Sequence, residues 1–352
     1  MYIKAIKHIR RLRGGSQAQL MAADDGHEYV VKFQGNPQTT RVLANDYLAV
    51  GPNGRIERTR AGHHICRCRD HSGIQDPAPD FVGDSRPGDD LYTACVLAIN
   101  PDTGKIKWHF QFTPHDMYDY DANETPVLVD LEDNGKIRHL LLQANRNGFF
   151  YVLDRTNGKF LQATPFVEKI NWATGIDASG RPVLSGRIPT AEGTKICPGI
   201  NGATNWFSPS YNPDTRLFFV MALESCNLFF AKPEPFTKGA TYYATGTKRL
   251  PDDHAQKILL ALSVPDGKRV WRYPQVGQGE SWAGTLATAG GLLFFGDDAG
   301  SLEAVEAATG RPLWHFNTGQ TLFASPMSYA VDGIQYIAIS GGSDVLSFAL
   351  PH

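Results

Sequence analysis

The sequence predicts an all-β chain whose larger part is a partial β-propeller of about five blades, preceded by a small α/β N-terminal segment. Two observations support this fold class. The 352 residues include 35 Gly and 22 Pro among many short runs of Val, Leu, Phe and Tyr, which is typical of strands joined by tight turns. An eleven-residue motif also recurs along the chain, and repetition at a regular period is typical of propellers.

The motif consists of an apolar run, a turn that contains Gly, and a Trp four residues after that Gly. Full copies begin at Ala98, Ala261 and Ala304, and a weaker copy at Val152 lacks the Trp. Each copy predicts a hairpin, because Gly can adopt a positive φ. The turn glycines at 104, 158, 267 and 310 lie 54, 109 and 43 residues apart, which indicates roughly five blades. We expect each Trp to pack between neighbouring blades. Ordinary hairpins in a β-sandwich are the alternative.

The residues before the propeller differ in character. Residues 18–22 and 29–33 are predicted as strands and 40–45 as a helix, whereas 50–74 are rich in Arg, His and Gly without periodicity. We therefore expect an N-terminal fragment at 1–49, a linker or poorly ordered stretch at 50–74, and the propeller at 75–352.

Charge and hydropathy exclude several functions. The 34 Lys and Arg against 36 Asp and Glu leave no basic excess for nucleic acid or an anionic membrane. The sequence contains no run of ~18 apolar residues, the length that a helix needs to span a bilayer. The N-terminus is basic but lacks the apolar run of a signal peptide, so the chain as written is expected in the cytoplasm.

The segment from His115 to Asp121 holds three carboxylates, those of Asp116, Asp119 and Asp121. Such crowding is unfavourable unless a cation shares the site. If the backbone is extended, Asp119 and Asp121 point to the same side. Two carboxylates on one side suit a hard cation such as Ca²⁺ or a larger, more highly charged ion. A solvated acidic turn is the alternative.

Several motifs, in order along the chain, resemble those of one enzyme family. These are residues 86–89 (RPGD), 113–116 (TPHD), 145–148 (NRNG), 202–206 (GATNW) and 282–288 (WAGTLAT). From about 75 to 352 the chain resembles the quinoprotein methanol and ethanol dehydrogenases, which depend on pyrroloquinoline quinone (PQQ). The resemblance implies the C-terminal half of an eight-bladed propeller, a periplasmic location, oxidation of a primary alcohol to an aldehyde, and a cytochrome c-type electron acceptor.

The resemblance also implies roles for individual residues. Asp119 matches the catalytic base, which takes the alcohol proton while hydride passes to the quinone C5. Arg146 matches the arginine that hydrogen-bonds the quinone oxygens. Asn205 and Trp282 match positions that contact the cofactor. The alternatives are a surface arginine in an Asn-Gly turn for Arg146, and packing for Asn205 and Trp282.

The metal assignment rests on the same resemblance. Asp121 stands where lanthanide-type members have an extra aspartate, so the resemblance implies a lanthanide in preference to Ca²⁺. Asp119, Asp121 and Asp76 are the candidate ligands, with Asp76 at the position of the family's metal-binding Asn. Cys197 and Cys226 match a family disulfide, which requires an oxidising compartment.

The chain also departs from the family. The strand with the Trp that stacks on PQQ, the upstream metal-binding Glu and the vicinal disulfide have no counterpart. Residues 10–49 instead resemble the start of a HipA-like kinase-related domain, without a kinase catalytic loop. The sequence therefore predicts an alcohol dehydrogenase, with a truncated or fused non-catalytic propeller remnant or an interaction scaffold as the alternative. A homo-oligomer is compatible with either function.

Overall fold

The computed structural model describes the backbone of residues 5–11, 18–23, 28–32, 64–66, 77–100, 103–238, 240–277 and 282–350, with side chains from residue 77 onward. All regular secondary structure in these ranges is β-strand. The chain forms two compact units, residues 1–63 with 68–71, and residues 64–67 with 72–352. The predicted helix at 40–45, the 50–63 and 67–74 parts of the predicted linker, and Asp76 lie outside the described residues. Residues 64–66, within the predicted linker, form a strand.

The first unit contains one antiparallel sheet in the order β1-β2-β3. Its strands are β1 (Ala5–Arg11), β2 (Ala18–Ala23) and β3 (Glu28–Lys32). The strands predicted at 18–22 and 29–33 are therefore present, and β1 was not predicted. The resemblance of residues 10–49 to a HipA-like domain stays a prediction.

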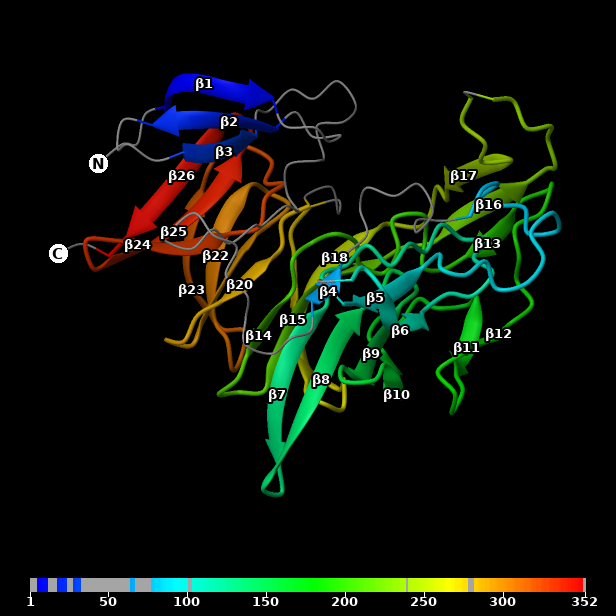
Figure 1. Ribbon diagram of the computed structural model, residues 1–352, viewed down its shortest axis with the longest axis horizontal. Coiled ribbons are helices and arrows are strands. Elements are labelled where there is room, and N and C mark those ends of the chain that lie inside the picture. Colours follow the sequence, from blue (N-terminus) through cyan, green and yellow to red (C-terminus); the bar gives the residue numbers. More distant parts are fainter. Residues whose placement is uncertain are drawn as a thin grey trace. The chain divides into compact units, whose positions relative to one another are not determined.

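The second unit contains five successive antiparallel sheets, here called blades 1 to 5 (Figure 1). Blade 1 comprises β4 (His64–Cys66), β5 (Cys95–Ile99) and β6 (Ile106–Gln111). Blade 2 comprises β7 (Val127–Asp133), β8 (Lys136–Ala144), β9 (Phe149–Asp154) and β10 (Lys159–Pro165). Blade 3 comprises β14 (Ser210–Asn212), β15 (Leu217–Glu224), β18 (Gln256–Ser263) and β19 (Arg269–Pro274).

Blade 4 comprises β20 (Thr285–Ala287), β21 (Leu292–Gly296), β22 (Ser301–Glu306) and β23 (Pro312–Asn317). Blade 5 comprises β24 (Met327–Val331), β25 (Ile334–Gly341) and β26 (Asp344–Ala349). Each blade pairs strands that follow one another along the chain, apart from an insertion between β15 and β18. The predicted partial propeller of about five blades is thus confirmed.

Two smaller sheets interrupt this series. One pairs β11 (Ala173–Ile176) with β12 (Pro182–Leu184), and the other joins β13 (Thr194–Ile196), β16 (Asn227–Ala231) and β17 (Thr245–Arg249). We call the second the inserted sheet. A disulfide between Cys197 and Cys226 links the ends of β13 and β16, as the family resemblance implied.

The core lies between neighbouring blades, because their central strands are apolar on both faces. In β15, Phe218 packs toward blade 2 and Phe219 toward blade 4. In β8, Leu141 packs toward blade 1 and Leu142 toward blade 3. Consecutive side chains of a strand point to opposite faces, so each central strand contributes to two cores. This is why these strands appear in the sequence as continuous apolar runs.

The repeated Trp and Gly form a contact between blades. The turn glycines Gly158 and Gly310 have φ values of +75° and +73°. A Cβ atom on Gly158 would lie 2.6 Å from Trp108 of blade 1, and one on Gly310 would lie 2.8 Å from Trp271 of blade 3. The expected packing of these tryptophans between blades is confirmed for both pairs.

The weaker copy of the repeat makes this contact in another way. Gln162 occupies the position of the missing Trp in blade 2, and its Nε2 donates to the carbonyl of Pro265 in the blade 3 turn. A hydrogen bond therefore replaces aromatic packing at this junction.

Replacing Gly310 with Ala is expected to destabilise the propeller. A non-Gly residue at positive φ costs ~1–2 kcal/mol, and overpacking against Trp271 adds ~1–3 kcal/mol. Gly104→Ala is the matched control, since Gly104 has a φ of +67° in the same repeat, but no described atom lies within 4 Å of where its Cβ would stand. Thermal unfolding should show a clearly larger loss for Gly310→Ala, and equal losses would contradict the proposed contact.

Candidate active site

The segment from Thr113 to Asp121, here called the carboxylate loop, leads from β6 of blade 1 toward β7 of blade 2. Asp119 has a φ of +59°, so the expected extended backbone is wrong at this residue. The buried carboxylate of Asp116 accepts hydrogen bonds from the backbone N–H groups of Tyr118 at 2.8 Å and Tyr120 at 2.7 Å. Despite the different backbone, Asp119 and Asp121 line the same cleft.

Arg146 joins the two carboxylates of this loop. It lies in the tight turn between β8 and β9, only 5% exposed. Its Nη1 donates to Asp121 Oδ2 at 3.0 Å and its Nη2 to Asp119 Oδ2 at 3.3 Å. Nη2 also donates to the carbonyl of Ile200 at 2.6 Å. The structure therefore brings Asp119, Asp121 and Arg146 together, and the alternative of a surface arginine is wrong.

Gly202 provides the space that Arg146 needs. Its φ is +76°, and a Cβ atom there would lie 2.7 Å from both Cβ and Cγ of Arg146. Any larger residue would push against the arginine stem. The glycine of the Gly-Ala-Thr-Asn-Trp motif thus has a direct role in placing the guanidinium group.

Asp119 and Asp121 line a cleft of about 480 Å³. Its other walls come from the segment before β5, the loop after β13, and the inserted sheet: Asp80, Phe81, Ile200, Tyr243, Thr245, Gly246 and Thr247. The Phe81 N–H donates to the carbonyl of Tyr243 at 3.2 Å, which ties two of these walls together.

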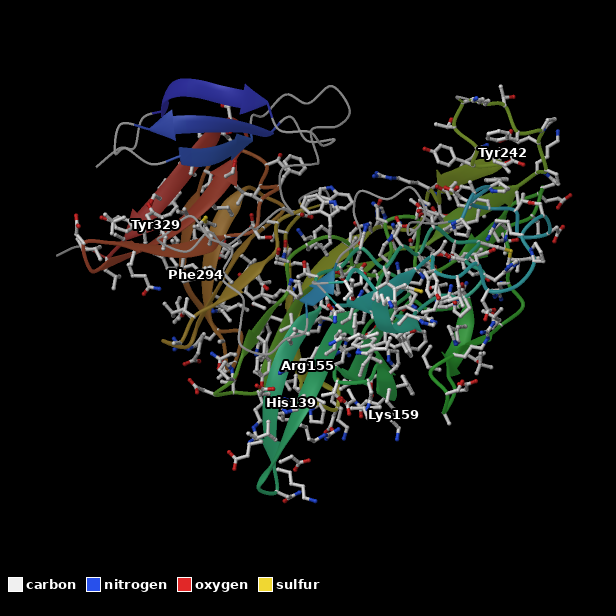
Figure 2. The ribbon with its side chains drawn as sticks, viewed as in Figure 1. His139, Arg155, Lys159, Tyr242, Phe294 and Tyr329 are labelled. Atoms are coloured by element: carbon white, nitrogen blue, oxygen red, sulfur yellow. A yellow bond between two sulfur atoms is a disulfide. The ribbon has the colours of Figure 1, made fainter. Side chains whose placement is uncertain are left out.

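The inserted sheet reaches the cleft through an unusual turn next to Tyr242 (Figure 2). Ala244 and Thr245 both have positive φ, at 54° and 121°. The carboxylate of Glu234 accepts from the Ala244 N–H at 2.9 Å and so helps to hold this conformation. Two successive non-glycine residues at positive φ are strained, and such strain often accompanies binding sites.

Asp80 is a cleft residue that the sequence interpretation missed. The pKa of its carboxyl is raised to about 7, first by burial and then by the negative charges of Asp119, Asp121 and Asp116. The candidate ligand chosen from sequence was Asp76, four positions earlier. The sequence signal that could have identified Asp80 is that it is a second aspartate in the same short segment as Asp76.

This raised pKa predicts a pH-dependent stability. The ordinary value for the Asp80 carboxyl is 3.8, so the folded chain binds this proton more tightly than the unfolded chain does. The contribution of this tighter proton binding to the free energy of unfolding is fully present below about pH 4 and is lost as the pH rises through 7. Asp80→Asn, which cannot ionise, should therefore raise the unfolding temperature most at pH 8 and progressively less toward pH 4, without added metal.

The control for this measurement is Asp84→Asn, an exposed carboxylate close in sequence. Its effect on the unfolding temperature should be small at every pH. An Asp80→Asn effect that is equal at pH 5 and pH 8 would contradict the raised pKa.

Asn205 and Trp282 are not among the residues that line the cleft. Asn205 is buried, and its Oδ1 accepts from Asn123 Nδ2 at 3.0 Å. Trp282 stacks on Trp206 with ring centroids 5.3 Å apart. The cofactor-contacting roles of these two residues therefore stay a prediction.

Buried polar atoms beside these residues fit a polar ligand. Among the described side chains, Asn145 Nδ2 and Thr204 Oγ1 are buried without a hydrogen-bond partner, and they adjoin Arg146 and Asn205 in sequence. Buried polar groups without partners are rare in folded proteins. The carbonyl and carboxylate oxygens of a quinone are acceptors of the kind that both donors lack, although neither residue is among those that line the cleft.

The fit to a metal is partial. Oxygen ligands from Asp119 and Asp121, with Asp80 nearby, have the chemistry that a hard cation prefers. Within the described parts of the chain, however, no three His, Cys, Asp or Glu side chains converge into a metal site. A cation held here would need further ligands.

The fold and these motifs agree with one protein family. The family model described as PQQ glucose/ethanol/alcohol dehydrogenase, β-propeller domain, matches residues 72–170 and 274–337. The quinoprotein alcohol dehydrogenase PedH of Pseudomonas putida is 41% identical over 280 residues, which cover 77% of this chain and 46% of that protein. The propeller unit belongs to the quinoprotein alcohol dehydrogenase family.

Two further relatives of this quinoprotein family extend the comparison. The lanthanide-dependent methanol dehydrogenase of Methylorubrum extorquens is 34% identical over 272 residues, covering 73% of this chain and 45% of that protein. The crystal structure of the quinohemoprotein alcohol dehydrogenase from Comamonas testosteroni superimposes with a TM-score of 0.70 at 35% identity, over 77% of this chain and 42% of that one. The chain spans a little under half the length of these relatives.

No helix within the described residues is long and apolar enough to cross a membrane.

Proposed function

We propose that this chain carries the base-containing part of a PQQ- and metal-dependent dehydrogenase that oxidises a primary alcohol to an aldehyde. The observation that carries the proposal is the pairing of Asp119 with the buried Arg146 at the wall of a cleft. The relatives named as alcohol and methanol dehydrogenases support the same reaction class.

In this proposal Asp119 takes the proton from the alcohol hydroxyl. Arg146 Nη2 donates a hydrogen bond to Asp119 Oδ2 at 3.3 Å, and this bond fixes the direction of the Asp119 carboxylate. As the O–H bond breaks toward Asp119, the alcohol carbon loses a hydride and becomes the aldehyde carbon. The chemistry that the quinone supplies when bound is acceptance of that hydride, which in this family passes to C5.

Arg146, Asn205 and Trp282 are the residues that would hold the cofactor. The Arg146 guanidinium is a fixed cation that favours negative charge on neighbouring oxygens. Asn145 Nδ2 and Thr204 Oγ1 add two buried donors that lack partners. Trp282 offers a flat aromatic surface, already stacked on Trp206.

Asp119, Asp121 and Asp76 would bind the metal, which acts as a Lewis acid toward the quinone carbonyl when present. We favour a lanthanide over Ca²⁺, because a trivalent ion gains more from the second carboxylate of Asp121. The pKa of Asp80 is raised first by burial and then by the negative charges of Asp119, Asp121 and Asp116, and this second cause supports a cation here.

The proposal includes a location and an electron acceptor. The Cys197–Cys226 disulfide supports an oxidising compartment, and the periplasm is the one that the family resemblance implies. Electrons would then leave the reduced cofactor for a cytochrome c-type protein.

The test uses the purified full chain, PQQ, and either La³⁺ or Ca²⁺. Reduction of an artificial dye is followed with methanol and with ethanol. We expect turnover that requires both PQQ and metal, with La³⁺ more effective than Ca²⁺. Absence of turnover, together with loss of all PQQ on gel filtration, would overturn the proposal.

A second candidate function is a non-catalytic propeller scaffold, and exposed aromatic residues on blade 4 favour it. Trp314 and Phe316 of β23 are 41% and 43% exposed, whereas Trp108 at the equivalent position of blade 1 is 9% exposed. Large exposed apolar surfaces favour association. Light scattering after gel filtration would show a homo-oligomer in this case and a monomer otherwise.

A further inference from the structure

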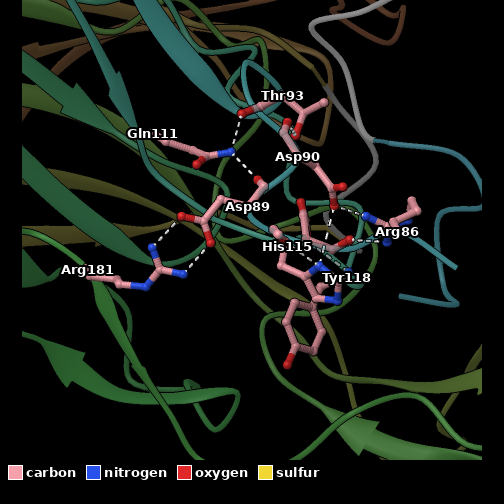
Figure 3. Close-up of polar contacts among 10 residues, drawn as sticks. Arg86, Asp89, Asp90, Thr93, Gln111, His115, Tyr118 and Arg181 are labelled. Atoms are coloured by element: carbon pink, nitrogen blue, oxygen red, sulfur yellow. Dashed lines mark hydrogen bonds and ion pairs between the residues drawn. The ribbon is translucent and has the colours of Figure 1, made fainter. Parts of the chain in front are cut away.

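Two motifs that the proposed reaction leaves unused contact each other at the start of the carboxylate loop. The first is residues 86–89 and the second is residues 113–116. The His115 N–H donates to the carbonyl of Asp89 at 3.2 Å, and His115 Nδ1 lies 2.9 Å from the carbonyl of Gly88. Figure 3 shows His115 beside Arg86 and Asp90. The first motif is thus packed directly against the start of the carboxylate loop.

Arg86 anchors the backbone at this junction. It is 8% exposed, its Nη2 donates to the carbonyl of Asp116 at 2.8 Å, and its Nη1 pairs with the carboxylate of Asp90. The segment that carries Arg86 is itself held, because Gln111 Nε2 donates to the carbonyl of Asp89 at 2.7 Å. The position of the Asp116 backbone is therefore fixed from a second part of the chain.

The side chain of Asp116 then fixes the residues that follow. It is 1% exposed, and its two carboxylate oxygens each accept one backbone N–H, from Tyr118 and from Tyr120. Hydrogen bonds to an ionised acceptor are shorter and stronger than neutral ones. An Asn has only one acceptor oxygen, so its NH₂ group would meet the second N–H donor to donor.

The hydrogen bonds to Asp116 are made by the two residues of the loop whose side chains point into the core, Tyr118 and Tyr120. The rings of Tyr118 and Tyr120 stack at 5.4 Å and are buried together with Trp172. Their hydroxyls donate to backbone carbonyls of Arg187 at 2.9 Å and Pro198 at 2.6 Å.

With both tyrosines held in the core, the residues between and after them face the other way. Asp119 and Asp121 line the cleft and reach Arg146. Asp119, with a φ of +59°, lies between the two residues whose amides Asp116 accepts.

We infer that Asp116 is a positioning residue, which directs the carboxylates of Asp119 and Asp121 toward Arg146 and the cleft, and that Arg86 holds Asp116 in place. Asp116 does not line the cleft. The functional meaning of this inference rests on the proposed dehydrogenase, but its structural content does not.

The first test is hydrogen–deuterium exchange of the full chain without ligands. Asp116→Asn should speed exchange of the Tyr118 and Tyr120 amides by at least ~10-fold, the equivalent of one net hydrogen bond of ~1.4 kcal/mol. Asp154→Asn is the matched control, since Asp154 Oδ1 accepts the Thr156 N–H at 2.8 Å in a turn of blade 2. That variant should change exchange in its own turn alone. Unaltered protection at residues 118–120 in Asp116→Asn overturns the inference.

The second test separates position from charge. Terbium luminescence, sensitised by the nearby aromatic rings, reports binding of Tb³⁺ to the full chain. Asp116→Glu keeps the charge but shifts both oxygens by one methylene. We expect Asp116→Glu and Asp116→Asn to weaken Tb³⁺ binding equally, by ~10- to 100-fold. Wild-type affinity in Asp116→Glu would show that only charge matters and would overturn the inference.

The two tests fail in different ways. If the wild-type chain binds no Tb³⁺, the proposed metal-dependent function is wrong, and the exchange experiment alone decides whether Asp116 positions the loop. If either Asp116 variant fails to fold, Arg86→Lys provides the second measurement. It should also speed exchange at Tyr118 and Tyr120, because a lysine cannot pair with Asp90 and the Asp116 carbonyl in the same planar geometry.

Discussion

Replacing Asp119 with Asn is expected to lower the turnover of PQQ- and La³⁺-dependent alcohol oxidation by ~100- to 10,000-fold, the usual contribution of a general base. Asn has nearly the shape of Asp and can still accept a hydrogen bond from Arg146 Nη2, so the loop should keep its structure. It cannot accept the alcohol proton. The measurement is the initial rate of dye reduction with ethanol at saturating PQQ and La³⁺.

Asp84→Asn serves as the control, because Asp84 is exposed and does not line the cleft. Its rate should equal that of the wild-type chain. An Asp119→Asn variant that keeps PQQ and retains most of its turnover would show that Asp119 is not the base.

Replacing Asp121 with Ala is expected to weaken La³⁺ binding by ~100-fold, the upper end of the range for groups around a metal site. The Coulomb attraction of one carboxylate is half as large again for a trivalent ion as for a divalent one, so Ca²⁺ binding should fall less. Titration calorimetry with each metal, in the presence of PQQ, measures both changes. Because La³⁺ binding falls more than Ca²⁺ binding, the ratio of the La³⁺ affinity to the Ca²⁺ affinity should decrease.

Two outcomes would contradict this role for Asp121. Unchanged affinity for both metals would mean that Asp121 is not a ligand, although its bond to Arg146 at 3.0 Å would remain. An equal loss for La³⁺ and Ca²⁺ would mean that Asp121 binds the metal without selecting it.

The propeller was predictable because its repeat is visible in the sequence. The spacing of Gly104, Gly158, Gly267 and Gly310 indicated the number of blades, and all four glycines adopt the positive φ that the hairpins require. The contact made by Gln162 was not predictable, because a polar residue at the Trp position carries no signal of its partner. The inserted sheet was missed as well, since its short strands lack the repeat motif and two of them lie between β15 and β18.

The site was predictable in its residues and less so in its geometry. Motif resemblance identified Asp119, Asp121 and Arg146, which the structure brings together. It gave no indication that Asp119 has a positive φ, because no residue type in the loop marks that conformation. Asp80 was missed because its raised pKa depends on burial and on the charges of residues distant in the sequence.

The cleft wall formed by the inserted sheet and the residues just before its strand β17 could not be predicted from the sequence either. Tyr243, Thr245 and Thr247 come from a part of the chain more than one hundred residues after the carboxylate loop. No local pattern marks them as cleft residues. Their place depends on how the inserted sheet packs near Phe81, whose N–H bonds to the Tyr243 carbonyl.

Native mass spectrometry of the full chain, after incubation with PQQ and La³⁺ and removal of excess ligand, tests most directly whether this half-length chain holds a working cofactor site. We expect a dominant species with one quinone and one lanthanide per chain, and loss of both from an Arg146→Met variant. A spectrum with only the unliganded chain would contradict the proposed dehydrogenase and would favour the non-catalytic propeller scaffold.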